Sequence, residues 1–381
     1  MSDLGREPPY EVAALMSHPG GNVGDDGASA LSRQEGPARH HPGDRSLWDQ
    51  PLCTIVVTHH NYAHLLEGAL LSLLDQTHDG WECVVIDDAS RPEDHGRAEA
   101  IVRGLADRRI SFIANERRLG QIDTFFSGLS RTTGEFVTLL DPDDRFAPTY
   151  LEDMLGAHLN SAIFCPIVSC DQKLVRADGA LLTGAWKGCG GKESVNTPLR
   201  IEDGAGKSRA LLYFSPRDPR WLWSSSSGLM VRRAALNLLV PSRPLDYSAA
   251  DTYVVHGAHF LGGTIFLPKA LVYRGVHASN HYLSDSIISM QQTMRRAGGP
   301  SRAKECRQAV VEAMFHNGVL DHFSEKYLAG VLGKHFKRDE AAWFRKTCPK
   351  AYRLWQLGRP LHRTLKRFFP WPWSRRATRA G

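Results

Sequence analysis

The sequence predicts an α/β protein whose central sheet is mostly parallel and flanked by helices. From Cys53 to Asp141, apolar runs of strand length alternate with longer runs of helical periodicity, a pattern typical of βαβ units. The crossover of such a unit places its two strands parallel and adjacent. Polar residues cluster where these strands end. Ligands of open parallel sheets bind beyond the carboxyl ends of the strands, so the clusters are expected to share one site.

The expected elements follow a regular order through the first part of the chain. They are strand 53–58, helix 63–76, strand 83–86, helix 94–106, strand 110–115, helix 121–131 and a strand ending at Asp141. The pattern is looser over residues 164–219. Later elements are expected as strand 228–231, an amphipathic helix through His259, strands 264–267 and 270–273, and helices after residue 284.

Length and composition predict a large buried core and a cytoplasmic protein. The chain has 381 residues, of which 42% are hydrophobic, enough for a large domain with appendages. No run approaches the roughly 20 apolar residues that span a bilayer. Residues 1–49 lack the apolar centre of a signal peptide and are expected to form a disordered extension. The seven cysteines include no C-x-x-C pair, which favours free buried thiols.

The basic character of the chain belongs to its tail. Residues 341–381 contain 11 Lys and Arg and no acid, whereas the remainder has 36 basic against 41 acidic residues. A nucleic-acid-binding domain carries its basic surface on the domain itself, so no nucleic-acid partner is expected. From Pro360 the tail has apolar residues on one helical face and cationic residues on the other. This pattern predicts either peripheral contact with an anionic membrane or a basic helix docked on its own domain.

An acidic turn is the most informative local feature. Asp141, Asp143 and Asp144 follow a buried strand within one turn, and like charges this close are tolerated when a cation or water lies among them. Carboxylate oxygens suit Mg²⁺ or Mn²⁺. The alternative is a solvated turn in which Asp144 caps the segment that begins near Pro148.

Two nucleotide-binding motifs are excluded. A Rossmann dehydrogenase needs a Gly-rich turn after the first strand, but residues 58–62 read Thr-His-His-Asn-Tyr. Residues 204–208 read Gly-Ala-Gly-Lys-Ser, and the first glycine of a P-loop would fall at Ile201.

The ordered motifs resemble the family 2 glycosyltransferases of the GT-A fold over about residues 52–159. They are residues 58–62, a Leu-rich helix ending Asp-Gln-Thr at 75–77, Val-Val-Ile-Asp-Asp-Ala-Ser at 84–90, Gly-Glu-Phe at 134–136 and Asp-Pro-Asp-Asp at 141–144. The resemblance implies a GT-A domain over residues 50–284, divided into a nucleotide-binding half (50–145) and an acceptor half (146–284). Residues 285–381 are then a helical, basic C-terminal extension.

The same resemblance implies the site residues. The nucleotide-sugar contacts would come from Thr58, His60, Asp87, Asp88, Asp141 and Asp143. Asp143 and His277, the latter in Tyr-Arg-Gly-Val-His at 273–277, would hold Mg²⁺ or Mn²⁺. Asp251 would be the catalytic base, with Asp246 as its substitute; the alternative for Asp251 is a carboxylate stabilised near a helix N-terminus.

Departures from the family pattern bear on these roles. Ala250 replaces the usual Glu before Asp251, no Asn accompanies Phe126, and His60 stands where an aromatic residue is usual. Trp221 and Trp223 are expected either to pack or to stack on an acceptor ring. His256 and His259 are expected to pack within a helix rather than bind zinc.

The predicted function is an inverting, metal-dependent transfer of a sugar from a nucleotide-diphosphate donor to a hydroxyl acceptor. The acceptor is expected to be a glycan or lipid-linked glycan of the cell envelope. Two alternatives stay open: a nucleotidyltransferase on a related sheet, disfavoured because the first strand lacks a Gly-rich basic loop, and a catalytically silent GT-A-fold protein that binds carbohydrate or acts as a scaffold.

Overall fold

The computed structural model confirms the α/β architecture. It describes residues 51–176, 179–182, 197–202, 208–219, 221–245, 250–277, 303–336, 340–349, 352–353 and 356. The predicted N-terminal extension, Asp246 and the amphipathic segment after Pro360 lie outside these residues.

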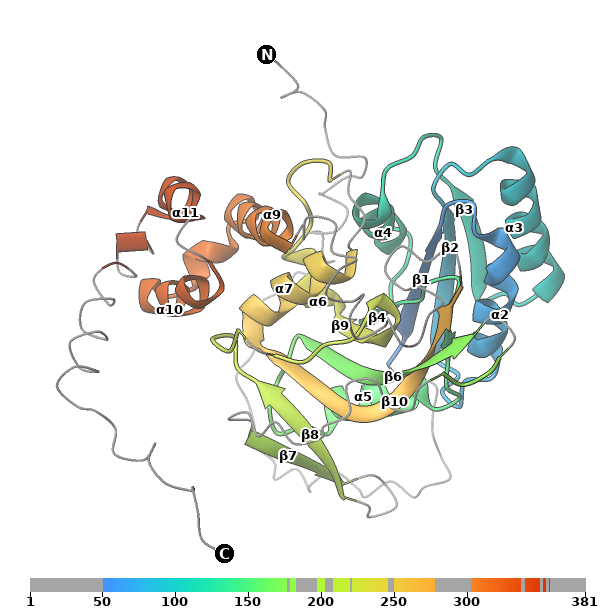
Figure 1. Ribbon diagram of the computed structural model, residues 1–381, viewed down its shortest axis with the longest axis horizontal. Coiled ribbons are helices and arrows are strands. Elements are labelled where there is room, and N and C mark those ends of the chain that lie inside the picture. Colours follow the sequence, from blue (N-terminus) through green and yellow to red (C-terminus); the bar gives the residue numbers. More distant parts are fainter. Residues whose placement is uncertain are drawn as a thin grey trace, which may run out of the picture.

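One sheet of ten strands runs through the molecule, in the order β3-β2-β1-β4-β9-β6-β10-β8-β7, with β5 paired to β10 (Figure 1). The strands are β1 (Cys53–His59), β2 (Trp81–Asp87), β3 (Ile110–Ala114), β4 (Phe136–Leu139), β5 (Arg145–Phe146), β6 (Ile167–Arg176), β7 (Thr197–Glu202), β8 (Ser208–Phe214), β9 (Leu229–Arg232) and β10 (Thr264–Val276). The first four are mutually parallel, as the βαβ pattern predicted. β9 then lies antiparallel between β4 and β6, and β6 is parallel to β10.

Helices cover both faces of the sheet. They are α2 (Ala63–Leu74), α3 (Pro92–Leu105), α4 (Gln121–Leu129), α5 (Tyr150–Leu159), α6 (Arg233–Asn237), α7 (Ala250–Gly262), α9 (Ala303–His316), α10 (Glu325–His335) and α11 (Ala341–Thr347), with short 3-10 turns η2 (Ser226–Gly228) and η3 (Val319–His322). β1 shows why two layers form. Ile55 packs in one core with Leu66 and Leu70 of α2, whereas Val56 packs in the other with Phe125 of α4, because successive strand residues face opposite ways.

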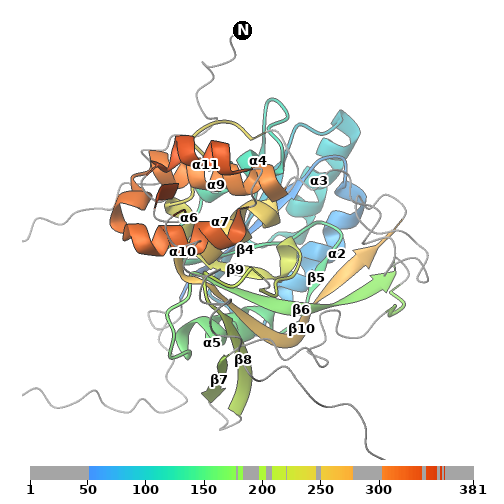
Figure 2. The same cartoon turned by 60° about the vertical axis from the view of Figure 1, so that its left-hand side comes forward.

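The C-terminal helices extend the core that contains Val56 and Phe125, here called the second core, beyond the sheet. Val310, Leu328 and Val331 belong to the same buried cluster as Val255 of α7. In both views α9, α10 and α11 stack beyond α7, on the side away from α2 and α3 (Figures 1 and 2). The hydrophobic core therefore continues across the predicted boundary at residue 284, and the boundary itself stays a prediction.

One expectation about the second half of the domain was wrong, and strands formed in one region for which none had been predicted. The predicted strands 264–267 and 270–273 are one strand, β10, whose pairing with β6 shifts register between Leu267 and Val272. The loosely patterned region 164–219 contains three strands, β6, β7 and β8. β6 escaped the hydrophobic pattern because its buried residues include Ser169, Asp171 and Gln172.

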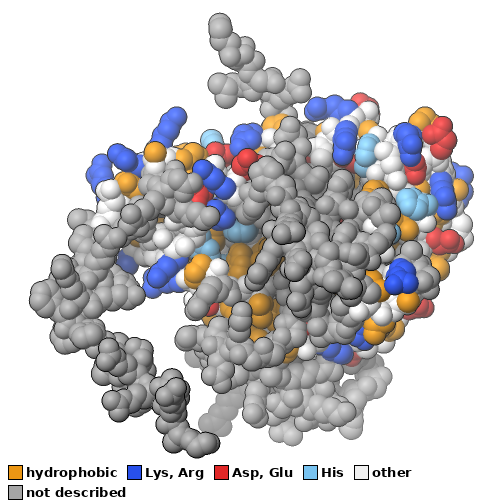
Figure 3. Space-filling view, in the orientation of Figure 1, with side chains coloured by type: hydrophobic (Ala, Val, Ile, Leu, Met, Phe, Trp, Pro, Cys, Tyr) orange, Lys and Arg blue, Asp and Glu red, His pale blue; other side chains and the backbone are white. Residues whose placement is uncertain are grey.

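Other compositional expectations hold within the described residues. The six cysteines there are free and buried, as predicted. No helix in the described ranges is both long and apolar enough to cross a bilayer. On the visible face, Lys and Arg are interspersed with Asp and Glu over much of the described surface (Figure 3).

Candidate functional site

The carboxyl ends of β1, β2 and β4 lie side by side, as predicted from the strand order. β1 pairs with β2 on one side, where Thr58 lies opposite Ile86, and with β4 on the other. Thr58 is half-buried at this edge. The loops after these strands carry the three polar clusters, so the sheet brings together segments that are far apart in the sequence.

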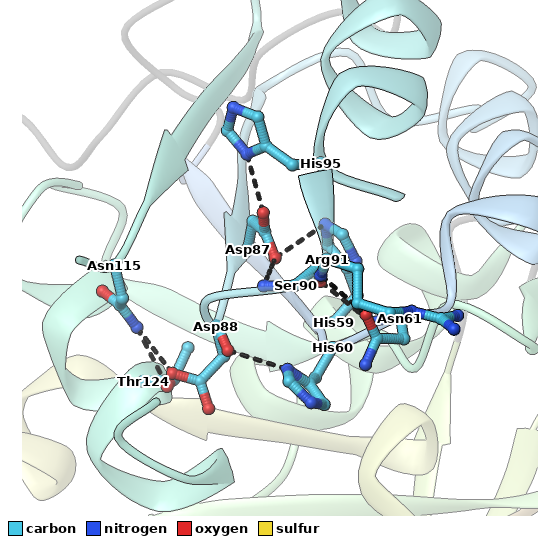
Figure 4. A network of polar contacts seen from close by, with 10 residues as sticks. All are labelled: His59, His60, Asn61, Asp87, Asp88, Ser90, Arg91, His95, Asn115 and Thr124. Carbon is cyan, nitrogen blue, oxygen red and sulfur yellow. Dashed lines mark hydrogen bonds and ion pairs between the residues drawn. The ribbon is translucent and has the colours of Figure 1, made fainter. Parts of the chain in front are cut away.

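Asp87, at the end of β2, is a buried carboxylate in a polar network with two histidines (Figure 4). Its Oδ2 lies 2.8 Å from His95 Nδ1, and its Oδ1 accepts a hydrogen bond from the Ser90 amide at 2.9 Å and lies 3.8 Å from His59 Nε2. Burial raises the pKa of Asp87, but the hydrogen bonds from Ser90 and His95 outweigh burial and leave the pKa below its usual value. Asp87 therefore stays ionised and fastens α3 to the sheet, and its nucleotide contact stays a prediction.

Asp88 organises the loop before α4 (Figure 4). Its Oδ1 accepts hydrogen bonds from Asn115 Nδ2 at 2.9 Å and the Leu119 amide at 2.8 Å, and its Oδ2 accepts one from the Gly120 amide at 2.9 Å. His60 Nδ1 donates to the Asp88 carbonyl oxygen at 2.9 Å. A carboxylate has about four acceptor positions, and three of those of Asp88 are used by these bonds.

The acidic turn between β4 and β5 holds three carboxylates close together. Asp141, Asp143 and Asp144 offer oxygens within 4.8 Å of one another. Burial, and then the charges of Asp143 and Asp251, raise the pKa of Asp141 to about 7. Burial and the neighbouring acids also raise the pKa of Asp144 well above its usual value, although Arg274 opposes both shifts. The turn therefore carries more negative charge than Arg274 offsets, which favours binding of a cation.

The two predicted metal ligands lie in contact. His277 Nε2 is 3.0 Å from Asp143 Oδ2, although the two residues are 134 positions apart in the sequence. Gly275 allows this approach, because a Cβ atom there would lie 2.2 Å from the Asp143 carbonyl oxygen. One imidazole and several carboxylate oxygens form a donor set that suits Mn²⁺ or Mg²⁺. The residues present thus fit a divalent cation.

Asp251 lies in the first turn of α7, close enough to Asp141 for their charges to interact. Its charge contributes to the raised pKa of Asp141, and burial raises its own pKa despite opposing hydrogen bonds from Thr252. Gln121 connects Asp141 to the start of α7: its Nε2 is 3.5 Å from Asp141 Oδ1, and its Oε1 accepts from the Ala250 amide at 3.2 Å. The N-terminus of α7 is thus joined to the acidic turn, and the role of Asp251 as base stays a prediction.

Several site residues were missed by sequence reasoning. Arg274 lies among the acids, and its place in the Tyr-Arg-Gly-Val-His segment was the available signal. Ser226 donates to the Asp141 carboxylate, and Ser227 Oγ donates to Asp144 Oδ2 at 2.6 Å. The serine run gave no signal, because hydroxyl residues at that position are typical of ordinary loops.

Trp221 packs against two histidines of α7. The Trp221 ring lies edge-on to His259, with centroids 3.7 Å apart, and is 5.2 Å from the His256 ring. Both tryptophans contact the second core. Packing of the histidines in the helix agrees with the prediction, and acceptor stacking by the tryptophans stays untested.

Comparison with known proteins decides the family. Residues 54–212 match the family model described as Glycosyl transferase family 2. This chain carries a family 2 glycosyltransferase domain. The family match and the mixed sheet assign the α/β architecture to the GT-A fold, as predicted. The Asp88 loop and the acidic turn lie within the matched residues, whereas Asp251 and His277 follow them in the sequence.

Relatives of the transferase domain are named glycosyltransferases. An uncharacterized glycosyltransferase of Nostoc sp. is 27% identical over 65% of this chain and 71% of its own length. A UDP-Glc:α-D-GlcNAc-diphosphoundecaprenol β-1,3-glucosyltransferase of Escherichia coli is 30% identical over 30% of this chain and 44% of its own length. Among solved structures, S. aureus TarS 1–349 in complex with UDP-GlcNAc aligns with a TM-score of 0.44 and 17% identity, covering 82% of this chain and 91% of that chain. Several matches thus span less than two thirds of the related protein.

Proposed function

We propose that this protein is an inverting, metal-dependent glycosyltransferase that moves a sugar from a nucleotide-diphosphate donor to a hydroxyl acceptor. The observation that carries the proposal is the contact between Asp143 and His277 beside two further carboxylates. This donor set lies at the strand ends where an open sheet binds its ligand.

The donor would lie across the ends of β1, β2 and β4. Thr58, His60 and Asp88 would contact the nucleoside, and Asp141 its ribose. Asp143 and His277 would hold Mn²⁺ or Mg²⁺, which when bound supplies positive charge that stabilises the departing diphosphate. Arg274 adds a fixed positive charge in the same region, since it lowers the pKa values of Asp141, Asp144 and Asp251 against the effect of burial.

Asp251 is the proposed general base. The acceptor hydroxyl must lose a proton as it attacks the anomeric carbon, and a carboxylate on the face opposite the leaving group can take that proton. The raised pKa of Asp251, caused first by burial, brings its basicity closer to neutral pH. Attack from that face inverts the anomeric centre.

The acceptor is proposed to be a glycan or a lipid-linked glycan of the cell envelope. Relatives include the Escherichia coli enzyme that acts on a diphosphoundecaprenol-linked sugar and a putative teichuronic acid biosynthesis glycosyltransferase of Bacillus subtilis. Such an acceptor fits an enzyme whose basic tail, residues 341–381, contacts an anionic membrane.

The test measures release of nucleoside diphosphate from UDP-, GDP- and dTDP-sugars with Mn²⁺ and then with EDTA. Asp143→Asn should abolish Mn²⁺-dependent release. The matched control is Glu312→Gln, because Glu312 lies on α9 and forms an exposed ion pair with Arg243. Binding of a sugar nucleotide without turnover on any acceptor would favour the silent GT-A alternative. No binding of any donor would reject both.

A further inference from the structure

Asp144 is bonded differently from the other acids of the turn. It is 1% exposed, and both of its carboxylate oxygens are engaged within the protein. Oδ2 accepts a hydrogen bond from Ser227 Oγ at 2.6 Å, and Oδ1 accepts one from the Gly275 amide at 3.0 Å. Asp143, by comparison, is partly exposed and contacts His277. The two adjacent carboxylates therefore have different tasks.

The Ser227 hydroxyl joins both ends of the acidic turn. Its oxygen accepts a hydrogen bond from the Asp141 amide at 3.0 Å. A backbone amide can only donate, so the hydroxyl proton is left for Asp144. Ser227 is fully buried, and water does not replace either bond. One hydroxyl therefore fixes residues 141 and 144 relative to each other and to the segment that leads into β9.

Asp144 extends this connection to β10. The Gly275 amide of β10 donates the second hydrogen bond to Asp144, and His277 follows two residues later, directly after the strand. His277 reaches Asp143, which precedes Asp144 in the turn. Close approach at Gly275, where no side chain would fit against the Asp143 carbonyl, sets the same spacing. The separation of Asp143 and His277 thus depends on the Ser227–Asp144–Gly275 chain of hydrogen bonds.

We propose that Ser227 and Asp144 are positioning residues that hold Asp143 and His277 in the geometry needed for a divalent cation, and that Asp144 is not itself a ligand. The inference rests on the proposed function and assigns a division of labour within the Asp-x-Asp-Asp turn. It couples the cation site to η2 and β9, so a change behind the site alters cation binding without touching the cation.

The effect of Ser227→Ala on the Kd for Mn²⁺ distinguishes the two possible roles of Asp144. If Asp144 is a positioning residue, loss of the hydroxyl lets the turn shift, and the Kd for Mn²⁺ should rise about 10-fold, the scale of a lost bond to a buried charge. If Asp144 is a ligand, release from Ser227 frees Oδ2, and the Kd should stay equal or fall. Titration followed by Mn²⁺ electron paramagnetic resonance, with Mn²⁺ alone and with Mn²⁺ plus UDP, gives the readout.

Ser225→Ala is the matched control. Ser225 lies in the same serine run, is 8% exposed, and donates to Gln172 Oε1 at 2.9 Å without contacting the acids. Both alanine variants should lower the metal-free melting temperature, because Ser225→Ala removes one buried hydrogen bond and Ser227→Ala removes two, but only Ser227→Ala should change the Kd for Mn²⁺. Equal Kd values for the two variants would overturn the inference.

Asp144→Asn gives an independent measurement. The amide oxygen can still accept from Gly275, and the amide nitrogen can donate to Ser227, so the connection survives without the charge. The Kd for Mn²⁺ should rise less in Asp144→Asn than in Asp143→Asn. We expect the Kd of Asp144→Asn to be lower than that of Asp143→Asn by a factor of at least about 10. Equal losses in the two variants would make Asp144 a ligand. Failure of the wild-type protein to bind Mn²⁺ in either titration would instead reject the metal dependence of the proposed function.

Discussion

Removal of the Asp141 charge should stabilise the metal-free protein at the expense of its function. A carboxyl whose pKa is raised in the folded state binds more protons when folded than when unfolded, so folding stability falls as pH rises between the two pKa values. For Asp141 that window runs from the usual value of 3.8 to about 7. Each pKa unit corresponds to about 1.36 kcal/mol, which gives an upper bound of about 4 kcal/mol at pH 8. Asp141→Asn abolishes this cost.

The assay is urea unfolding of wild type and Asp141→Asn at pH 8 and pH 5 in EDTA. At pH 8 the variant should be more stable by up to about 4 kcal/mol, and at pH 5 the advantage should shrink to about 1.5 kcal/mol because the folded wild-type carboxyl is then protonated. Saturating Mn²⁺ should stabilise wild type more than the variant, because a cation that binds only the folded state adds stability by mass action. Glu312→Gln should stay within about 0.5 kcal/mol of wild type under all conditions, since it removes only an exposed ion pair. A variant that is no more stable than wild type at pH 8, or whose advantage does not depend on pH, would refute the crowding of the acidic turn.

Four further predictions address the base, the backbone, the buried histidines and the tail. Asp251→Asn should lower turnover about 10²-fold or more in a coupled assay for nucleoside diphosphate, with the Kd of the donor unchanged; near-normal turnover would move the role of base elsewhere. Gly275→Ala should abolish the Mn²⁺ binding that wild type shows in an electron paramagnetic resonance titration, because its Cβ would lie 2.2 Å from the Asp143 carbonyl oxygen. Burial lowers the pKa values of His256 and His259 to about 3 and 2, so the unfolded state binds more protons and stability should fall by roughly 2 kcal/mol per histidine from pH 7 to pH 5; His259→Gln should show a correspondingly smaller pH dependence in urea unfolding. Deletion of residues 341–381 should abolish flotation with anionic liposomes while neutral liposomes bind neither form, and equal flotation of both forms would remove the membrane role.

Some strands of the sheet were predictable from their sequence pattern and others were not. The parallel strands were predicted well because β1 and β2 are buried on both faces and read as continuous apolar runs. β6 was missed because Gln172 is buried with its Oε1 accepting hydrogen bonds from Ser224 and Ser225, so its polarity is satisfied by residues far along the chain. β10 was divided wrongly because Pro268 and Lys269 interrupt its apolar pattern where the pairing shifts register.

The sequence by itself determined the βαβ order, the acidic turn after β4 and the family resemblance, because these depend on local periodicity and on motifs within short segments. Tertiary structure alone decided which acid faces which partner. Nothing in the sequence relates Ser227 or Gly275 to Asp144, or turns Asp87 toward His95 and Asp88 toward Asn115. Those choices follow from the register of strands distant in sequence, and a local pattern carries no information about which backbone donor a folded sheet will place against a buried carboxylate.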